Sequence, residues 1–195
     1  MAIRIDGITY HRPLIVFAME AEAGQEFKEF ETLFTGVGKV NAAYHLTKRL
    51  MSEPKPDLIV NLGTAGSSFF NRGAIVVSEA FVQRDMDVSG LGLPKYKTPF
   101  IEEPEVLAYG LVPNGFEKGI CGSGDNFGTT MTKDIFNLID MEAYAFAFLC
   151  KREELPFLCV KYVSDGADES AAAEWSTQLK VAATELRNAV KKLEV

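Results

Sequence analysis

Short runs of apolar, β-branched residues alternate along this chain with segments of helical periodicity, and this alternation restricts the fold more than any other feature. It is typical of strands joined by helical crossovers, in which helices cover both faces of a largely parallel sheet. The expected strands are residues 13–19, 57–63, 74–82, 119–122 and 156–164. The sequence therefore predicts an α/β domain with a parallel sheet at its centre.

Amphipathic helices are expected in two places. Between Val40 and Met51, alanine and leucine residues recur at three- and four-residue spacing, which gives one apolar face. A longer apolar face is formed near the C-terminus by Leu179, Ala182, Ala183, Leu186, Ala189, Val190 and Leu193. Between Ser89 and Gly115 this periodicity is replaced by Gly, Pro and isolated apolar residues, so we predict a loop or lid there.

Composition excludes several classes of protein. With 47% apolar and 24% charged residues, the 195-residue chain has the balance of one globular domain. The net charge is −7 and the only dense basic cluster is Lys191-Lys192, which argues against nucleic-acid binding. No apolar stretch approaches the roughly 20 residues that cross a membrane, and MAIRIDGITY lacks the apolar centre of a signal peptide. We expect a cytoplasmic protein whose partner is a small molecule, with no nucleic acid and no membrane.

Cysteine and histidine give no sign of a metal site. Cys121, Cys150 and Cys159 have no CxxC spacing and lie among apolar neighbours, as packed, reduced thiols do. Neither His11 nor His45 has a companion at metal-ligand spacing on the same predicted element. We therefore expect no metal and no Cys-His dyad.

Polar segments follow several of the predicted strands, where open α/β sheets usually bind ligands. They are AMEAE (18–22), NLGTAGS (61–67), GSGDNF (122–127) and SDGAD (164–168). In a fifth segment, DMEAYAF, Glu142 lies within an otherwise apolar run. A buried ionised carboxylate needs a partner or a polar ligand, so Glu142 is a candidate for a binding site.

Each acidic residue in these segments also has an ordinary structural interpretation. Glu20 and Glu22 suit the first turn of a helix, where the helix dipole favours negative charge. Asp165 and Asp168 suit a turn or cap before the last helix. Taken one at a time, these residues do not distinguish a site from a local structural role.

Taken together and in this order, the segments resemble the nucleoside phosphorylase/nucleosidase superfamily, and most closely its methylthioadenosine/S-adenosylhomocysteine nucleosidase branch. The resemblance extends from about Leu14 to Leu193 through AMEAE, TGVGKVNAA, DLIVNLGTAGS, RDMDVSG, GSGDNF, DMEAYAFAF and VKYVSDGAD. It implies one three-layer α/β/α domain over residues 1–195, with a central mixed, mostly parallel sheet. It also implies a homodimer that needs no cofactor and hydrolyses 5′-methylthioadenosine, S-adenosylhomocysteine or a similar adenine nucleoside.

The resemblance implies two catalytic residues and polar groups around them. Glu22 matches the residue that orients and deprotonates the attacking water. Asp165 matches the aspartate that protonates adenine N7, and Ser164 precedes it and orients it. Thr64 and Lys161 match polar groups around the nucleophile. Protonation lets adenine leave as a neutral base, while carboxylates stabilise the oxocarbenium character of the sugar.

Four further residues are expected to bind the substrate on the same grounds. Glu142 matches the glutamate that accepts hydrogen bonds from the ribose hydroxyls, with Met141 beside the sugar. Phe127 matches the aromatic residue that stacks on the base. The main chain at Phe127 and Gly128 matches the segment that reads the adenine edge.

Two alternatives to hydrolysis stay open: a phosphate-dependent purine nucleoside phosphorylase, and a non-catalytic nucleoside-binding protein. Hexameric phosphorolytic relatives carry an arginine-bearing loop after the first strand, where this chain has AMEAEAGQ. An acidic residue there repels phosphate, although Lys161 places a cation nearby. Binding alone would not require both Glu22 and Asp165. The segment between Asp87 and Ile120 is shorter than in typical relatives, so the 5′ substituent stays open.

Overall fold

The computed structural model describes residues 1–128, 134–168 and 171–195, and of residues 172–174 only the backbone. The strands are β1 (Ile3–Ile5), β2 (Ile8–Tyr10), β3 (Pro13–Phe17), β4 (Glu31–Phe34), β5 (Leu58–Gly66), β6 (Ile75–Gln83), β7 (Leu107–Ala108), β8 (Glu117–Ser123), β9 (Leu138–Asp140) and β10 (Phe157–Asp165). The helices are α1 (Glu20–Ala23), α2 (Lys39–Leu50), α3 (Ala143–Arg152), α4 (Ala171–Lys191) and the 3-10 turn η1 (Ser89–Leu91). All the strands and helices predicted from the sequence are present, with shifted ends.

The central sheet closes on itself. Parallel pairs join β5 to β10, β6 to β8 and β8 to β9, whereas β10 and β6 are antiparallel. An antiparallel pairing of Gly66 with Ile139 joins β5 to β9 and completes the ring. β3 and β4 extend the sheet from β5 as parallel neighbours. The predicted mixed, mostly parallel sheet is confirmed, and its closure was not foreseen.

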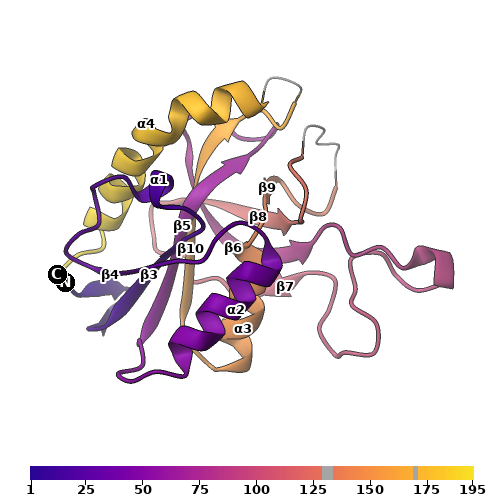
Figure 1. Cartoon of the computed structure of the whole chain (residues 1–195), viewed down its shortest axis with the longest axis horizontal. Helices are drawn as coiled ribbons and strands as arrows, with labels where there is room; N and C mark the ends of the chain where they lie inside the picture. The colour runs from indigo at the N-terminus through magenta and orange to yellow at the C-terminus, as the bar shows by residue number, and fades with distance from the viewer. Residues whose placement is uncertain (129–133, 169–170) are drawn as a thin grey trace.

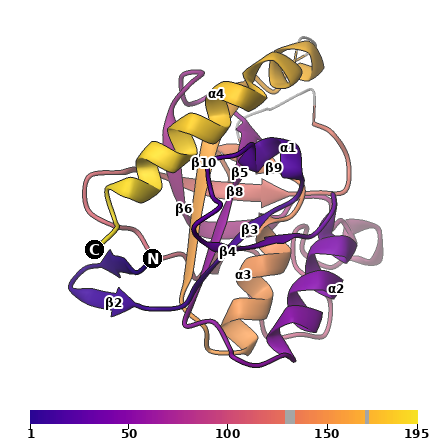
Figure 2. The same cartoon turned by 60° about the vertical axis from the view of Figure 1, so that its left-hand side comes forward.

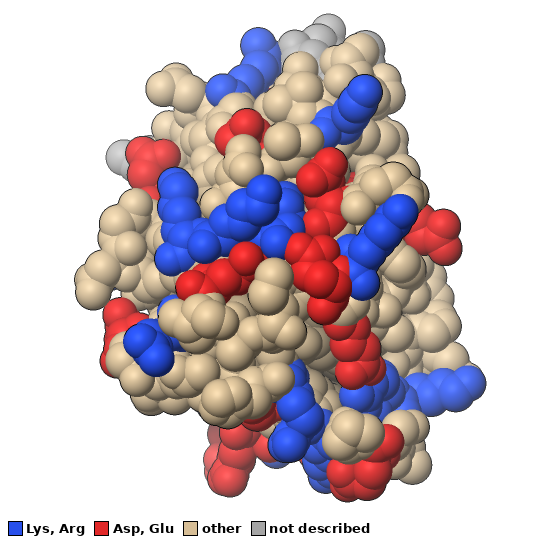
Figure 3. All heavy atoms as spheres, turned by 90° about the vertical axis from the view of Figure 1, so that its left-hand side faces the viewer, with Lys and Arg blue, Asp and Glu red and all other residues tan. Residues whose placement is uncertain are grey.

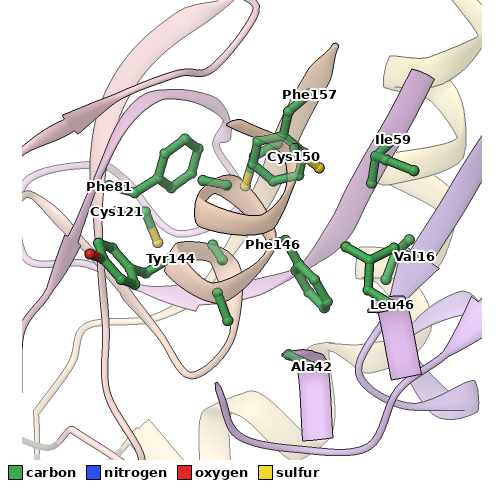
Figure 4. Packing of buried hydrophobic residues seen from close by; sticks show 14 of the residues in the cluster. Val16, Ala42, Leu46, Ile59, Phe81, Cys121, Tyr144, Phe146, Cys150 and Phe157 are labelled. Carbon is green, nitrogen blue, oxygen red and sulfur yellow. The ribbon is translucent and has the colours of Figure 1, made fainter. Parts of the chain in front are cut away.

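Helices cover the sheet on both sides. Figures 1 and 2 show α1 and α4 on one side and α2 and α3 on the other. Each side has its own buried apolar cluster, and Figure 4 shows the cluster beneath α2 and α3. There Leu46 of α2 and Phe146 of α3 are fully buried and pack towards the strands. The predicted three-layer arrangement is therefore confirmed.

A hairpin at the N-terminus was not predicted. β1 and β2 are antiparallel and turn at Asp6 and Gly7, which both have positive φ angles of 47° and 87°. An Asp-Gly pair between β-branched residues is a strong hairpin signal, and it is visible in the sequence as RIDGIT. The hairpin lies beside the end of the chain, where the N–H of Arg4 donates to the carbonyl of Leu193.

The segment predicted as a loop or lid, residues 89–115, is mainly irregular and contains η1 and β7. Figure 1 shows its first part projecting away from the sheet. Glu103 anchors it, because its buried carboxylate pairs with Lys151 at 2.6 Å and Arg152 at 3.2 Å on α3. Beyond this anchor, Phe100 is fully exposed.

Charged groups of both signs are mixed on the face shown in Figure 3, where basic side chains lie beside acidic ones. Within the described residues, no helix combines the length and hydropathy needed to cross a bilayer.

Two phenylalanines follow each other in the loop after β5. Phe69 is half exposed, whereas Phe70 packs against the core.

Candidate active site

A cavity of about 210 Å³ opens where β3, β5, β9 and β10 end. It is lined by Ala18, Met19, Glu22, Val37, Thr64, Ala65, Gly66, Arg84, Asn126, Phe127, Gly128, Ile139, Asp140, Met141, Glu142, Ser164, Asp165 and Trp175. Every site residue expected from the sequence lies on this wall except Lys161. Residues that are distant along the chain thus line one cavity, which can hold part of a small molecule.

Glu22 lies in the first turn of α1, at the edge of the cavity, and is 5% exposed. Its Oε1 accepts hydrogen bonds from the N–H and the hydroxyl of Thr64, both at 3.0 Å. Its Oε2 accepts from the N–H of Met19 at 3.3 Å. The carboxylate approaches β5 closely because residue 63 is glycine: a Cβ there would lie 3.1 Å from Oε1. Glu22 is therefore both a first-turn acid and a cavity residue.

Asp165 is the last residue of β10 and is 4% exposed. Its Oδ2 accepts a hydrogen bond from the Ser164 hydroxyl at 2.7 Å, and its Oδ1 accepts from the N–H of Ala167 at 2.9 Å. The second bond is the turn-type contact that sequence analysis considered as an alternative. Gly66 faces this carboxylate, and a Cβ there would lie 2.6 Å from Oδ1.

Glu142 is the residue that precedes α3 and is 7% exposed. The N–H of Gly38, in the loop before α2, donates to its Oε1 at 2.8 Å. Burial raises the pKa of Glu142 to about 8, and the nearby Asp140 carboxylate contributes to the increase. The protein around Glu142 therefore favours the protonated form of this carboxyl group.

Lys161 lies beneath the cavity and does not line it. Its ammonium is 2% exposed and pairs with Asp140 at 2.9 Å. Burial opposes both charges, but the pair keeps the pKa of Asp140 below and that of Lys161 above its ordinary value. Lys161 is still close to Glu22, because a Cβ on Gly63 would lie 3.6 Å from Nζ and 3.1 Å from Glu22 Oε1.

Asp140 also organises the surrounding elements. Its Oδ2 accepts from the N–H of Ala143, the first residue of α3, at 2.9 Å. Its Oδ1 accepts from the hydroxyl of Ser123, at the end of β8. Glu142 follows Asp140 by two positions, so these bonds fix the segment that places Glu142 in the cavity.

Lys39, the lysine of the TGVGKV segment, forms two ion pairs near the cavity. Its Nζ pairs with Asp85 at 2.7 Å and with Asp125 at 2.9 Å. Although partial burial opposes ionisation of Asp85, the hydrogen bond from Lys39 lowers the pKa of that carboxyl. These ion pairs join the loop carrying Gly38 to the loop carrying Phe127.

Arg84 and Trp175 line the cavity and were not expected from the sequence. Arg84 donates to the side-chain oxygen of Asn126 at 2.6 Å and to its carbonyl at 2.5 Å. Its signal was its place in the RDMDVSG segment. The indole N–H of Trp175 donates to the Thr64 hydroxyl oxygen at 3.0 Å. The predicted apolar face of the last helix begins at Leu179 and so does not include Trp175.

The base end of the cavity combines Phe127 with glycine. Phe127 is 47% exposed, so its ring is available to a flat ligand. Gly128 lies against Ile139, and a Cβ at position 128 would be 2.6 Å from Ile139 Cδ1. The described residues contain no group of three or more His, Cys, Asp or Glu side chains suited to a metal ion.

Comparisons with known proteins agree with this arrangement. The family model described as "Phosphorylase superfamily" matches residues 32–193. The 5′-methylthioadenosine/S-adenosylhomocysteine nucleosidase of Haemophilus influenzae (strain PittEE) is 32% identical over 176 residues, which cover 80% of this chain and 76% of that protein. The corresponding nucleosidase of Marinomonas sp. (strain MWYL1) is 29% identical over 179 residues, covering 81% and 77%.

A solved structure shows the same fold. The Helicobacter pylori 5′-methylthioadenosine/S-adenosylhomocysteine nucleosidase with butyl-thio-DADMe-Immucillin-A superposes with a TM-score of 0.82 at 18% identity. The match covers 92% of this chain and 96% of that structure. The chain therefore belongs to the phosphorylase superfamily and, within it, to the branch of 5′-methylthioadenosine/S-adenosylhomocysteine nucleosidases.

Proposed function

We propose that this chain is a nucleosidase that hydrolyses the N-glycosidic bond of 5′-methylthioadenosine, S-adenosylhomocysteine or a similar adenine nucleoside and releases adenine. One observation carries the proposal. The carboxyl groups of Glu22, Glu142 and Asp165, which are distant in sequence, line a single cavity together with the Phe127 ring. The relatives of this chain in the nucleosidase branch support the choice of an adenine nucleoside as substrate.

The reaction divides between two ends of the cavity. At the base end, Phe127 stacks on adenine, the main chain at Phe127 and Gly128 reads its edge, and Asp165 donates a proton to N7. The C1′–N9 bond then breaks and adenine departs neutral. Ser164 orients Asp165 through the hydrogen bond described above. A positioned acid of this kind contributes about a hundred- to ten-thousand-fold in rate.

At the sugar end, Glu142 accepts hydrogen bonds from the ribose hydroxyls, and Met141 lies beside the ring. The oxocarbenium-like sugar is attacked at C1′ by a water whose proton passes to Glu22. Thr64 positions Glu22 through two hydrogen bonds. Lys161 acts from beneath, where it offsets the charge of Asp140 and Glu22.

Water rather than phosphate is the proposed nucleophile, because a phosphate anion beside Glu22 would need a cation to hold it. Of the described cations, Lys161 lies close to Glu22 but is paired with Asp140 and does not line the cavity. Arg84 lines the cavity but donates to Asn126, next to Phe127. Phosphate would therefore meet a carboxylate at the place where it would have to bind.

Adenine release in phosphate-free buffer tests the proposal. We expect release from at least one of 5′-methylthioadenosine, S-adenosylhomocysteine, adenosine and aminofutalosine, with a free sugar as the second product. Dependence on phosphate with formation of a sugar 1-phosphate would identify a phosphorylase. Binding without release of base would identify a binding protein, and faster release of hypoxanthine or guanine would contradict the role of Asp165.

Replacing the two catalytic residues tests their roles. Asp165→Asn and Glu22→Gln should each lower kcat about a hundred- to ten-thousand-fold. Asp168→Asn is the matched control, because Asp168 belongs to the same segment but is exposed and pairs with Arg72 at 3.5 Å. Normal turnover in Asp165→Asn would refute the assignment.

The cytoplasmic location expected from the sequence stays a prediction.

We also propose that the chain forms the homodimer that the resemblance implies. Val40 and Tyr44, one turn apart on α2, are 77% and 60% exposed, beside the half-exposed Val37 at the cavity. An interface there would cover apolar surface next to the cavity. Sedimentation velocity should show a dimer that Val40→Glu dissociates; a monomeric wild type would refute this assembly.

A further inference from the structure

Trp175 makes a directed contact with the residue that holds Glu22. It is the single tryptophan of the chain, and its side chain reaches from α4 to the cavity wall. The indole nitrogen can only donate a hydrogen bond. In its 3.0 Å contact with the Thr64 hydroxyl, the hydroxyl oxygen is therefore the acceptor.

The second contact of that hydroxyl then has a fixed direction. Thr64 Oγ1 lies 3.0 Å from Glu22 Oε1, and the ionised carboxylate can only accept. The hydroxyl has one hydrogen, which must point at Glu22. The result is a one-way series of hydrogen bonds from the Trp175 N–H through the Thr64 O–H to the Glu22 carboxylate, and such series strengthen their members.

The hydroxyl is the adjustable part of the environment of Glu22. Among the described residues, the other donors to this carboxylate are the backbone N–H groups of Thr64 and Met19, which the strand and the helix entry hold in place. A threonine hydroxyl hydrogen can rotate. Without the indole, it would no longer be held to one direction by a neighbouring donor.

We propose that Trp175 is a positioning residue that acts through Thr64 to fix the orientation of Glu22. This inference rests on the proposed role of Glu22 as the base that takes the proton of the attacking water. The competing view is that Trp175 is simply an apolar part of the cavity wall, in which case its N–H has no effect on turnover.

Trp175→Phe separates the two views, because phenylalanine keeps an aromatic ring and lacks the N–H. The loss of one hydrogen bond of about 0.5–1.5 kcal/mol corresponds to a kcat that is about two- to thirteenfold lower. KM should change less than about twofold, since the bond is made to the protein rather than to the substrate. A raised KM with unchanged kcat would support the apolar wall and overturn the inference.

A double-mutant cycle with Thr64→Val tests whether the effect passes through the hydroxyl. In the Thr64→Val background, Trp175→Phe should have no further effect on kcat, and an additive loss would overturn the inference. Tyr162→Phe is the matched control, because it removes a 2.8 Å hydrogen bond to Gln178 of the same helix, away from the cavity. It should leave kcat and KM unchanged.

The indole N–H gives a readout that does not depend on activity. A single tryptophan yields one indole N–H signal in a proton–nitrogen NMR spectrum. This signal should move in Thr64→Val and in Glu22→Gln, and stay in place in Tyr162→Phe. An unmoved signal in Thr64→Val would refute the contact. A wild type that releases no adenine would refute the proposed function, while the NMR result would still decide whether the hydrogen-bonded series exists.

Discussion

Glu142 is a carboxyl group held where ionisation is opposed. Burial raises its pKa to about 8, with the Asp140 charge adding to the effect, and the Lys161 charge and the Gly38 N–H only partly offset it. Ribose hydroxyls in the cavity would supply further donors to the ionised form. A bound sugar therefore favours the ionised form of Glu142 more than the protein alone does.

This predicts that Glu142→Gln stabilises the free protein at alkaline pH. The raised pKa means that the folded protein retains a proton that the unfolded chain loses near pH 4.5, so this contribution to stability is present below pH 4.5 and is lost as pH rises through about 8. Glutamine does not ionise. In urea unfolding, the variant should exceed wild type by on the order of 1–3 kcal/mol at pH 9 and by little at pH 5.

The exposed Glu20 supplies the control for this experiment, since Glu20→Gln should show no such pH-dependent difference. Glu142→Gln should also raise KM, because the glutamine amide replaces a charged acceptor for the ribose hydroxyls. A variant that is less stable than wild type at pH 9 would contradict the electrostatic account.

At the level of single residues, sequence predicted the side chains whose identity is unusual for their position. Glu142 interrupts an apolar run, and Asp165 ends a strand, so both could be noticed. Trp175 could not, because an aromatic residue in a helix is ordinary until the fold places it on a cavity, and Arg84 was marked only by its place in the RDMDVSG segment. Lys161 was expected at the site, but the sequence of its strand gave no sign that Asp140 would hold it below the cavity surface.

Strand β5 is the element on which the site is built. Its end carries Gly63 and Gly66, which lie opposite Glu22 and Asp165, with Thr64 between them. Small residues here allow two carboxylates from different elements to approach one strand. Gly63 and Gly66 of the NLGTAGS segment are therefore needed because a side chain at either position would meet a carboxylate.

Gly66→Ala should consequently impair catalysis while the fold is retained. The new Cβ would lie 2.6 Å from Asp165 Oδ1, so the carboxylate must move. A displacement of about 1 Å in such a group can cost on the order of a hundredfold in turnover. Steady-state kinetics should show this loss, with an unchanged far-ultraviolet circular dichroism spectrum.

Gly90→Ala is the matched control, because a Cβ there would meet no atom within 4 Å. It should leave kcat at the wild-type value. Full activity in Gly66→Ala would show that the position of Asp165 against β5 is not required.

Element boundaries followed from sequence only where the local pattern agrees with the tertiary structure. The long apolar strands β5 and β10 were recognisable because both are buried along almost their whole length. β4 and β9 were missed. β9 has three residues and β4 has no fully buried residue, so neither has a pattern distinct from a loop. Their strand conformation comes from pairing with β3 and β8, which the local sequence does not encode.

At the scale of the whole molecule, the cavity is the place where the layers meet. Glu22 comes from α1 and Trp175 from α4 on one side of the sheet, whereas Glu142 precedes α3 on the other. Strands β5 and β10 contribute Thr64 and Asp165 between them. A ligand in the cavity therefore contacts elements from both sides of the sheet and the strands between them.

Adenine alone should then stabilise the entire fold. A ligand that binds only the folded state at about a hundred times its dissociation constant adds about 2.7 kcal/mol. For a chain of this size, that corresponds to a rise in Tm of about 5–10 °C in calorimetry. Asp165→Asn should lose most of the rise, because the proposed donor to N7 is replaced. An equal rise with hypoxanthine would show that the cavity does not distinguish the two bases and that Asp165 does not read adenine.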